Sequence, residues 1–176
     1  MKKVLAFDLS SNVGWAFTDN AAGFSRTTVV FGSENFAKAR GESMGMRYLR
    51  FRSWLEVMGE QCKPLDLVAY ELVTGNRSHR ASIIYGAFQS QLLTWCEQQG
   101  IQYMGLLPAD IKRHATGKGN ANKVAMIAAA EALGYHLEPD DDDEADALHL
   151  LEFVVEKYAK IDSKALSLAG GAPTAE

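Results

Sequence analysis

Residues 4–17 read VLAFDLSSNVGWAF, and this stretch decides which architecture the chain can adopt. Four consecutive apolar residues, 4–7, are typical of a short strand buried on both faces. Asp8 ends the run, and residues 10–14 are small and polar with a glycine, which is typical of a turn. A second strand is expected over residues 15–18. We therefore predict two strands joined by a short connection, with a carboxylate at the end of the first.

The periodicity of the remaining chain predicts alternating strands and helices. Further strands are expected over residues 27–31, 66–71 and 101–106. Helices are expected over residues 47–62 and 79–98, from Pro108, from a cap at Asn120 to a stop at Gly134, and from about 143 to 160. This order predicts an α/β fold of three layers, with a five-stranded mixed sheet flanked by helices. We expect one domain over residues 1–160 and a flexible C-terminal tail over 161–176.

The charge of the chain is unevenly distributed. The 176 residues carry a formal net charge of −4, but seven acids lie between Glu138 and Asp146. Without these seven, 15 acids face 18 Lys and Arg, a balance of +3. A mildly basic surface around an acidic pocket suits a metal-dependent nuclease. An acidic run by itself is more often a solvated loop.

Composition also limits where such a protein would act. No stretch of the sequence is long and apolar enough for a membrane span, and the short run after Lys2 and Lys3 is not a secretory signal. Cys62 and Cys96 form no CxxC or Cys/His cluster, so we expect two unpaired, buried thiols. These features favour a cytoplasmic protein without a membrane partner.

Four acids are candidates for a metal site. Asp8 and Glu71 end apolar strands, where an unpaired carboxylate is expensive to bury. Asp143 and Asp146 are three residues apart at the start of a helix, so they share one face. If the sheet and that helix pack together, the four carboxylates converge. Their mutual repulsion would be relieved by Mg²⁺, which prefers carboxylate oxygen, and two such ions would suit phosphodiester hydrolysis.

Each of these acids also has a simpler interpretation. Asp8 can open the turn that follows it, and Glu71 can pair with Arg77 or Arg80. Asp143 and Asp146 can stabilise a helix N-terminus through its dipole. Any single acid favours the structural interpretation, whereas the four together on this order of elements favour a site.

Four segments resemble the RuvC family of Holliday junction resolvases, whose fold is ribonuclease H-like. The opening VLAFDLSSNVGWAF matches the family's strand, Asp, turn and glycine, and AYELV places Glu71 at its mid-chain acid. DDEADALHL places Asp143 and Asp146 at its C-terminal acid pair. DIKRHATGKGNANKVAM resembles its two-lysine segment, with Lys112 and Lys123 at the lysines. The resemblance runs from about residue 3 to 158.

This resemblance implies a metal-dependent endodeoxyribonuclease that makes paired, symmetric nicks in four-way DNA junctions. The implied catalytic residues are the four acids, as metal ligands, with Lys112 and Lys123. The implied cofactor is Mg²⁺, two ions, with Mn²⁺ as a substitute. The expected DNA-binding residues are Arg77, Arg80, Lys112, Arg113, Lys118 and Lys123. A homodimer is implied as well. Positions Ile83, Ile84, Ala87, Phe88, Gln91 and Trp95 of helix 79–98 could face a partner subunit, although burial in the core alone would explain them.

The chain departs from the family pattern at two places. Leu9 and Ser10 stand where many members have Pro-Gly after the first acid. Thr74 stands near the position of an aromatic residue that stacks on junction DNA in cellular members. The second change puts the opening of the junction and the sequence preference in question.

Three other functions compete with a junction resolvase. A YqgF-like nuclease would keep the fold and act on RNA, but the Lys112–Lys123 segment and the surroundings of Glu71 favour DNA. An actin-like ATP-binding domain opens with a similar strand, Asp and turn, but it needs two lobes and more residues than 176. A non-catalytic module that binds branched DNA would not need an intact set of four acids.

Overall fold

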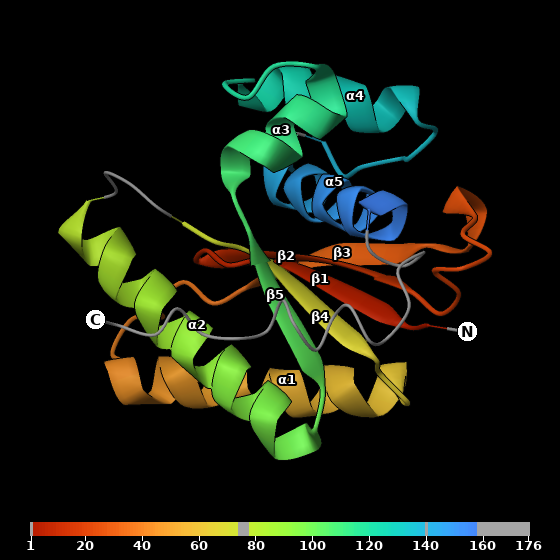
Figure 1. The fold of residues 1–176 in the computed structure, drawn as a ribbon. Helices are drawn as coiled ribbons and strands as arrows, with labels where there is room; N and C mark the ends of the chain where they lie inside the picture. Colours follow the sequence, from red (N-terminus) through yellow and green to blue (C-terminus); the bar gives the residue numbers. More distant parts are fainter. Residues whose placement is uncertain (1, 74–77, 140, 158–176) are drawn as a thin grey trace, which may run out of the picture.

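The computed structural model describes residues 2–73, 78–139 and 141–157 (Figure 1). Its elements, in chain order, are β1 (Val4–Asp8), β2 (Asn12–Thr18), the 3₁₀ turn η1 (Arg26–Thr28), β3 (Val30–Asn35), α1 (Met44–Cys62), β4 (Leu67–Glu71), α2 (His79–Gln99), β5 (Gln102–Leu106), α3 (Pro108–Thr116), α4 (Lys123–Ala132) and α5 (Asp142–Lys157). Thr74, Arg77 and the tail over 161–176 lie outside the described residues, so the expectations for them stay predictions.

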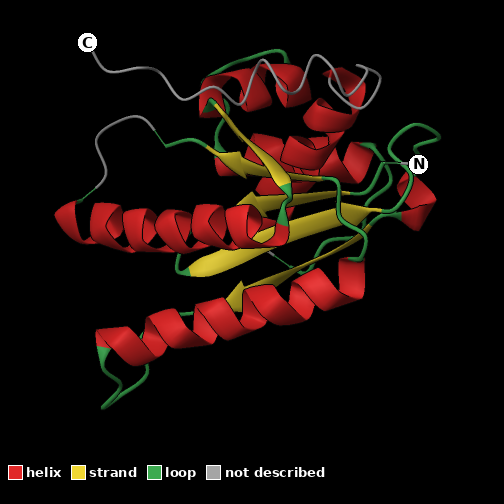
Figure 2. Ribbon diagram, turned by 60° about the horizontal axis from the view of Figure 1, so that its bottom comes forward, coloured by secondary structure: helices red, strands yellow, loops and turns green. Residues whose placement is uncertain are grey.

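The five strands form one mixed sheet in the order β3-β2-β1-β4-β5. β1 pairs with β2, and β2 with β3, in antiparallel register, whereas β1–β4 and β4–β5 are parallel. The long helices α1 and α2 lie on one side of the sheet, and α3, α4 and α5 lie on the other (Figure 1; Figure 2). The predicted three-layer α/β fold is therefore confirmed.

Several predicted boundaries were wrong because pairing and capping overrode the local signal. The third strand occupies Val30–Asn35 rather than 27–31, since its register is set by pairing with β2, and residues before it form η1. The second strand begins at Asn12 instead of 15 for the same reason. The cap of α4 is Asn122 rather than Asn120: its side chain accepts a hydrogen bond from the Ala125 amide at 3.0 Å.

Alternation along the strands divides the core in two. Val4 and Ala6 of β1 face α5, whereas Leu5 and Phe7 face α1 and α2. β4 follows the same rule, because Leu67 and Ala69 belong to the α5 side and Val68 and Tyr70 to the other. Successive side chains of a strand point to opposite faces, so these memberships also fix the side of the residue that ends each strand.

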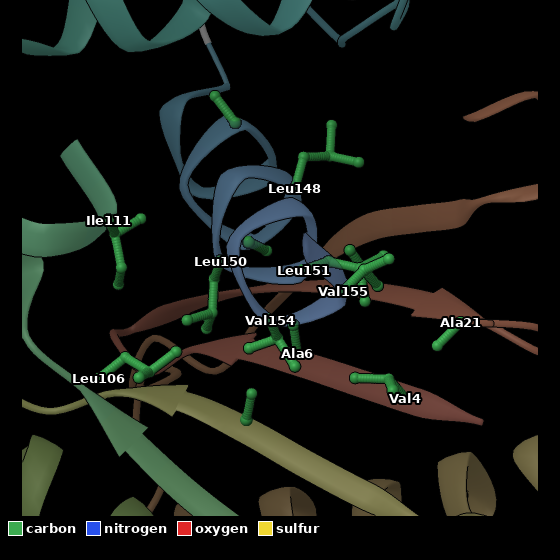
Figure 3. Packing of buried hydrophobic residues seen from close by; sticks show 14 of the residues in the cluster. Val4, Ala6, Ala21, Leu106, Ile111, Leu148, Leu150, Leu151, Val154 and Val155 are labelled. Carbon is green, nitrogen blue, oxygen red and sulfur yellow. The ribbon is translucent and has the colours of Figure 1, made fainter. Parts of the chain in front are cut away.

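The sheet face beneath α5 carries small side chains. Ala6, Ala16 and Ala69 are fully buried there, on three neighbouring strands. Leu150 and Val154 of α5 pack onto this surface, with Ala6 directly below the helix (Figure 3). Small residues let the helix approach the sheet closely, which brings its first turn to the ends of β1 and β4.

The opposite face of the sheet is filled by aromatic side chains. Arg47 of α1 is buried on this side as well, with an exposed fraction of 2%. Ile84, Phe88 and Trp95 of α2 were offered as interface positions, but all three are buried in the core of this chain. Ile83, with 50% exposure, is the large apolar member of that set that remains at the surface.

The cysteine and membrane expectations have clear outcomes. Cys62 and Cys96 are both free and buried, as predicted. Burial raises the pKa of Cys62 to about 11 and that of Cys96 to about 12, so neither thiol is a reactive group at neutral pH. Within the described ranges, every helix is too short or too polar to cross a bilayer.

Candidate active site

Asp8 and Glu71 end neighbouring parallel strands at the same level. Phe7 pairs with Tyr70, so Asp8 and Glu71 are the next residues on β1 and β4. Strand alternation puts both on the α5 side of the sheet. Their exposed fractions are 7% and 9%, so two carboxylates are held near one another with little access to water.

Asp143 joins this end of the sheet through the turn after β1. Its Oδ2 accepts a hydrogen bond from Asn12 Nδ2 at 2.8 Å, and its Oδ1 accepts one from Ser10 Oγ at 3.3 Å. Gly14 pairs with Asp8 across β1 and β2, and a Cβ atom at Gly14 would lie 1.9 Å from the Asp143 carbonyl oxygen. The first turn of α5 therefore rests on bare backbone next to Asp8.

Asp146 completes the convergence from one turn further along α5. Its Oδ1 is buried and has no hydrogen-bond partner among the residues that the structure describes. Burial, and then the negative charge of Glu71, raise the pKa of Asp146 to about 7. The positive charge of Lys112 acts in the opposite direction on the same carboxyl. Acids from β1, β4 and α5 and a lysine from α3 thus meet at one edge of the sheet.

The four acids do not form a closed ligand cluster in this structure. Among the described residues, no three His, Cys, Asp or Glu side chains are gathered closely enough to hold a metal ion. The conformation of Asp143 gives a physical reason, because both of its carboxylate oxygens accept hydrogen bonds from the turn after β1. The set of four therefore shares one edge of the sheet without closing around a common point.

The donor chemistry of this edge nevertheless fits a divalent cation. Its acids offer hard carboxylate oxygens, which Mg²⁺, Mn²⁺ and Ca²⁺ prefer. A buried carboxylate oxygen without a partner, such as Asp146 Oδ1, carries a desolvation cost that a cation would offset. Burial also raises the pKa of Asp143, although its hydrogen bonds from Asn12 and Ser10 counter that shift.

The two lysines singled out by the sequence differ in their contacts. Lys123, at the first position of α4, makes an ion pair with Asp142 at 2.6 Å. The hydrogen bond within this pair is the main cause of the raised pKa of Lys123, and the charges of Asp143 and Asp146 contribute less. Lys112 is half-buried on α3 and lies within electrostatic range of Asp146. Both lysines therefore border the acidic edge.

The rest of the expected DNA-binding patch is more dispersed. Arg113 is paired with Asp110 at 2.7 Å, and His114 with Glu156 at 2.7 Å. Lys118 is exposed in the loop after α3. Arg80 is exposed in the first turn of α2, on the opposite side of the sheet from α3. Arg77 lies outside the described part of the chain.

His149 has a structural contact. It is buried, and its Nε2 lies 2.9 Å from the Met126 carbonyl oxygen, so Nε2 is the donor. Burial lowers its pKa, which keeps the ring neutral. His149 therefore ties α5 to α4 and holds the helix that carries Asp143 and Asp146.

Sequence reasoning missed the residues that position the acids. Asn12 and Ser10 were assigned only to a turn, yet both bind Asp143. Ser33 of β3 binds Asp141 at 2.6 Å and anchors the start of α5 as well. Asn12 follows Asp8 by four residues, a spacing that carries no signal of its own. Only the packing of α5 on β2 creates these contacts.

These features define a class of protein. A mixed five-stranded sheet in this order, with acids ending its two central parallel strands and more acids opening the last helix, is the ribonuclease H-like fold with an acidic edge. Within that class the chain is RuvC-like in fold and in part of its sequence.

Solved structures show the likeness in fold. The RuvC of T. thermophilus in complex with Holliday junction substrate matches with a TM-score of 0.68 and 19% identity, over 86% of this chain and 91% of that one. A second Thermus thermophilus RuvC structure gives 0.66 and 20%, over 88% and 95%. The yeast mitochondrial Holliday junction resolvase Ydc2 gives 0.60 and 15%, over 88% and 78%.

The chain also resembles a known RuvC in sequence. The crossover junction endodeoxyribonuclease RuvC of Anaeromyxobacter sp. (strain K) is 29% identical over 105 residues. The match covers 60% of this chain and only 56% of that protein. No family model matches the chain.

Proposed function

We propose that this protein is a metal-dependent endonuclease that resolves four-way DNA junctions by paired, symmetric nicks. The observation that carries the proposal is the meeting of Asp8, Glu71 and Asp146 with Lys112 at one edge of the sheet. Asp143 is added by its bonds to the turn after β1. The likeness to RuvC in fold, and to one RuvC over part of the sequence, supports DNA junctions as the substrate.

In this proposal, Asp8, Glu71, Asp143 and Asp146 hold two Mg²⁺ ions, which Mn²⁺ can replace. When bound, such ions lower the pKa of water and stabilise charge on phosphate oxygens. The work of the chain is to supply ionised carboxylates in a site with little water. Asp146 is the demanding member, because its proton must be lost against a pKa raised by burial.

The basic residues would act on the DNA. Lys112 and Lys123 border the acids, so their charges would offset the negative charge that develops at the scissile phosphate. DNA would have to displace Asp142 from Lys123, since the two are paired in this structure. Arg77, Arg80, Arg113 and Lys118 would contact phosphates further away, and their number would set the salt dependence of binding.

We also propose that the protein is a homodimer and acts in the cytoplasm. One chain holds one set of acids and so can cut one strand, whereas resolution needs two opposed cuts. With Ile84, Phe88 and Trp95 committed to the core, the interface would have to use exposed apolar residues, of which α1 and α2 offer Met46, Leu49, Val57 and Ile83.

The decisive experiment compares substrates and metals. Labelled four-way junction, flap, duplex, single-stranded DNA and RNA–DNA hybrid are each incubated with the purified protein and Mg²⁺, Mn²⁺, Ca²⁺ or EDTA. We expect symmetric nicks in the junction with Mg²⁺ or Mn²⁺, binding without cleavage in Ca²⁺, and no cleavage in EDTA. Light scattering should give about twice the chain mass of 19.3 kDa.

A pair of variants controls that experiment. Asp146→Asn should lower cleavage by ~10²-fold or more while junction binding persists, because an amide is a poor ligand for Mg²⁺. Asp19→Asn removes an exposed carboxylate in the loop after β2 and should cleave like the wild type. A clear preference for RNA–DNA hybrid would reject the resolvase and leave a nuclease. A stable monomer that only nicks would reject paired cleavage.

A further inference from the structure

A basic pocket lies beside the candidate active site, on the side of the turn after β1 that faces α1 and α2. Its volume is about 320 Å³. Its polar lining comes from that turn, from the segment before α1, from α1 and from the start of α2, namely Ser11, Lys38, Arg47, Ser78 and Arg80. Three of these side chains are cationic, and none of the residues that line the pocket is acidic.

Arg47 is the unusual member, because it is buried without a counterion. Its exposed fraction is 2%, and its Nε atom is buried with no hydrogen-bond partner among the described residues. The guanidinium lies 5.4 Å from the Phe88 ring centroid, and its Nη2 donates to Ser11 Oγ at 2.8 Å. An unpaired buried charge is costly, so a ligand that brings a negative charge would stabilise this arrangement.

Glu42 acts electrostatically on Arg47, but this carboxylate is already occupied. Glu42 accepts hydrogen bonds from Arg50 at 2.7 and 3.2 Å. Across the described ranges of the chain, no carboxylate lies within ion-pair distance of Arg47, Lys38 or Arg80. The charges that line the pocket are thus left for a ligand from outside the chain.

The N-terminus of α2 adds the positive end of a helix dipole to the pocket. Ser78 caps this helix of 21 residues, and its first turn contains no acid. The N-terminus of a helix of this length carries unsatisfied amides and a partial positive charge, which favour a bound anion. The buried guanidinium and the helix start therefore offer the same electrostatic environment from two sides.

The turn after β1 joins this pocket to the acids. Ser10 and Asn12 bind Asp143 on the α5 side, and Ser11 between them binds Arg47 on the other. A ligand in the pocket would therefore be separated from the acidic edge by the width of one turn. Neighbouring phosphates of one DNA strand could occupy both places.

We propose that this pocket binds a backbone phosphate of the DNA strand that is cut, near the scissile phosphate. This inference rests on the proposed function. The buried Arg47 forms its floor, and the exposed Ser11, Lys38 and Arg80 form its rim. Contact at the rim explains why Lys38 and Arg80 have no acidic partner, and contact at the floor supplies the counterion that Arg47 lacks.

The test replaces single phosphates of a junction by uncharged methylphosphonate, one position at a time around the cleavage site. Binding is measured in Ca²⁺ for the wild type, Lys38→Ala, Arg80→Ala, Arg47→Met and a control, Lys63→Ala. Lys63 is exposed at the C-terminal end of α1, and Lys63→Ala removes one positive charge, as the pocket variants do. If Arg47→Met fails to fold, the two exposed rim variants still carry the test.

For the wild type, we expect one position at which the neutral phosphate weakens binding by on the order of tenfold. In the pocket variants that penalty should shrink or vanish, and the slope of log affinity against log salt should flatten by about one unit. Lys63→Ala should keep the full penalty. If every variant keeps the same penalty at every position, the pocket is not a phosphate site.

Failure of the proposed function would look different. A wild-type protein that binds no branched DNA would reject both the function and the pocket. A protein that binds junctions but does not cut them would reject only the nuclease, because the phosphate scan depends on binding alone.

Discussion

On one face of the sheet, large aromatic side chains fill the space between the strands and the helices α1 and α2, namely Phe7, Phe51, Phe88 and Trp95. On the other face, alanines and a glycine let α5 lie close to the strands. The aromatic face contains T-shaped and stacked ring pairs, such as Phe51 and Phe88 with centroids 4.2 Å apart. The α5 face contains the acids. Stability and chemistry are thus concentrated on opposite sides of one sheet.

This difference has a physical basis. Large aromatic side chains bury much apolar area and tolerate no water, which suits a stabilising core. Carboxylates need a partly polar surrounding and a backbone held at fixed positions, which small residues and hydrogen-bonded turns provide. The following predictions test this division, in order of their expected effect on the free energy of unfolding.

The largest loss of stability should come from the aromatic face. Trp95 is fully buried near the C-terminal end of α2, away from the pocket at Ser78. Trp95→Ala should lower the free energy of unfolding by about 3–5 kcal/mol, since it removes a large buried side chain. Denaturant unfolding measures this loss. Cleavage per folded molecule, assayed at low temperature, should stay near the wild-type value, and a hundredfold loss there would contradict the division.

On the α5 face, adding a single methyl group should give the opposite result, a smaller loss of stability with a large loss of cleavage. Gly14→Ala places a Cβ atom 1.9 Å from the Asp143 carbonyl oxygen, so α5 must move. Overpacking of this kind costs about 1–3 kcal/mol, and displacement of Asp143 and Asp146 should lower cleavage by ~10²-fold or more.

Gly86 of α2 gives the matched control for that substitution. A Cβ atom there meets nothing within 4 Å. Gly86→Ala should stabilise the protein by about 0.5–1 kcal/mol through helix propensity and leave cleavage unchanged. Equal effects of the two substitutions on cleavage would mean that the close approach at Gly14 is not needed for the site.

The acids on the α5 face should reduce stability when no metal is bound. Burial raises the pKa of Asp146 to about 7, so its ionisation costs more in the folded than in the unfolded state. In EDTA, the free energy of unfolding should therefore fall as the pH rises from about 4 through about 7. Asp146→Asn should remove most of this fall, which after solvent screening is on the order of 2 kcal/mol.

Urea unfolding at several pH values measures that effect, with Asp19→Asn as the control that should keep the fall. Added Mg²⁺ should restore stability to the wild type above pH 7 and have little effect on Asp146→Asn. A wild type whose stability in EDTA rises between pH 4 and 7 would show that Asp146 is better stabilised as an anion than its burial implies.

Much of this division was predictable from the sequence. The order of strands and helices gave the three layers, and the apolar runs before Asp8 and Glu71 gave two strand-ending acids. The spacing of Asp143 and Asp146 gave one helix face. These features are local, so propensity and periodicity report them well.

The parts that could not be predicted depend on contacts between distant segments. Arg47 lies in a helix with two other arginines, and nothing in its spacing marks it as the one that is buried. The bond from Asn12 to Asp143 spans 131 residues. The helical spacing of the apolar residues at positions 84, 88 and 95 is the same for a face buried in the core and for a face that binds a partner subunit. Only the packing of α2 on the sheet decides between the two.

The smallest effect on stability is expected at Lys123, where the effect on cleavage should still be large. Its ion pair with Asp142 joins side chains that are 76% and 22% exposed, so Lys123→Ala should cost at most about 1 kcal/mol of unfolding free energy. Its charge lies close to Asp142, Asp143 and Asp146, so its loss should lower turnover more than junction affinity.

Lys118→Ala removes an exposed charge of the loop after α3 and should instead weaken binding and flatten the salt dependence of binding by about one unit of log–log slope. Single-turnover cleavage and binding in Ca²⁺ separate the two effects. Lys63, an exposed lysine paired with Glu60, gives the control, and Lys63→Ala should change neither. If Lys123→Ala and Lys118→Ala alter turnover and affinity in the same ratio, the lysine at the acidic edge is a DNA contact like any other. The chemistry of the α5 face would then rest on its acids alone.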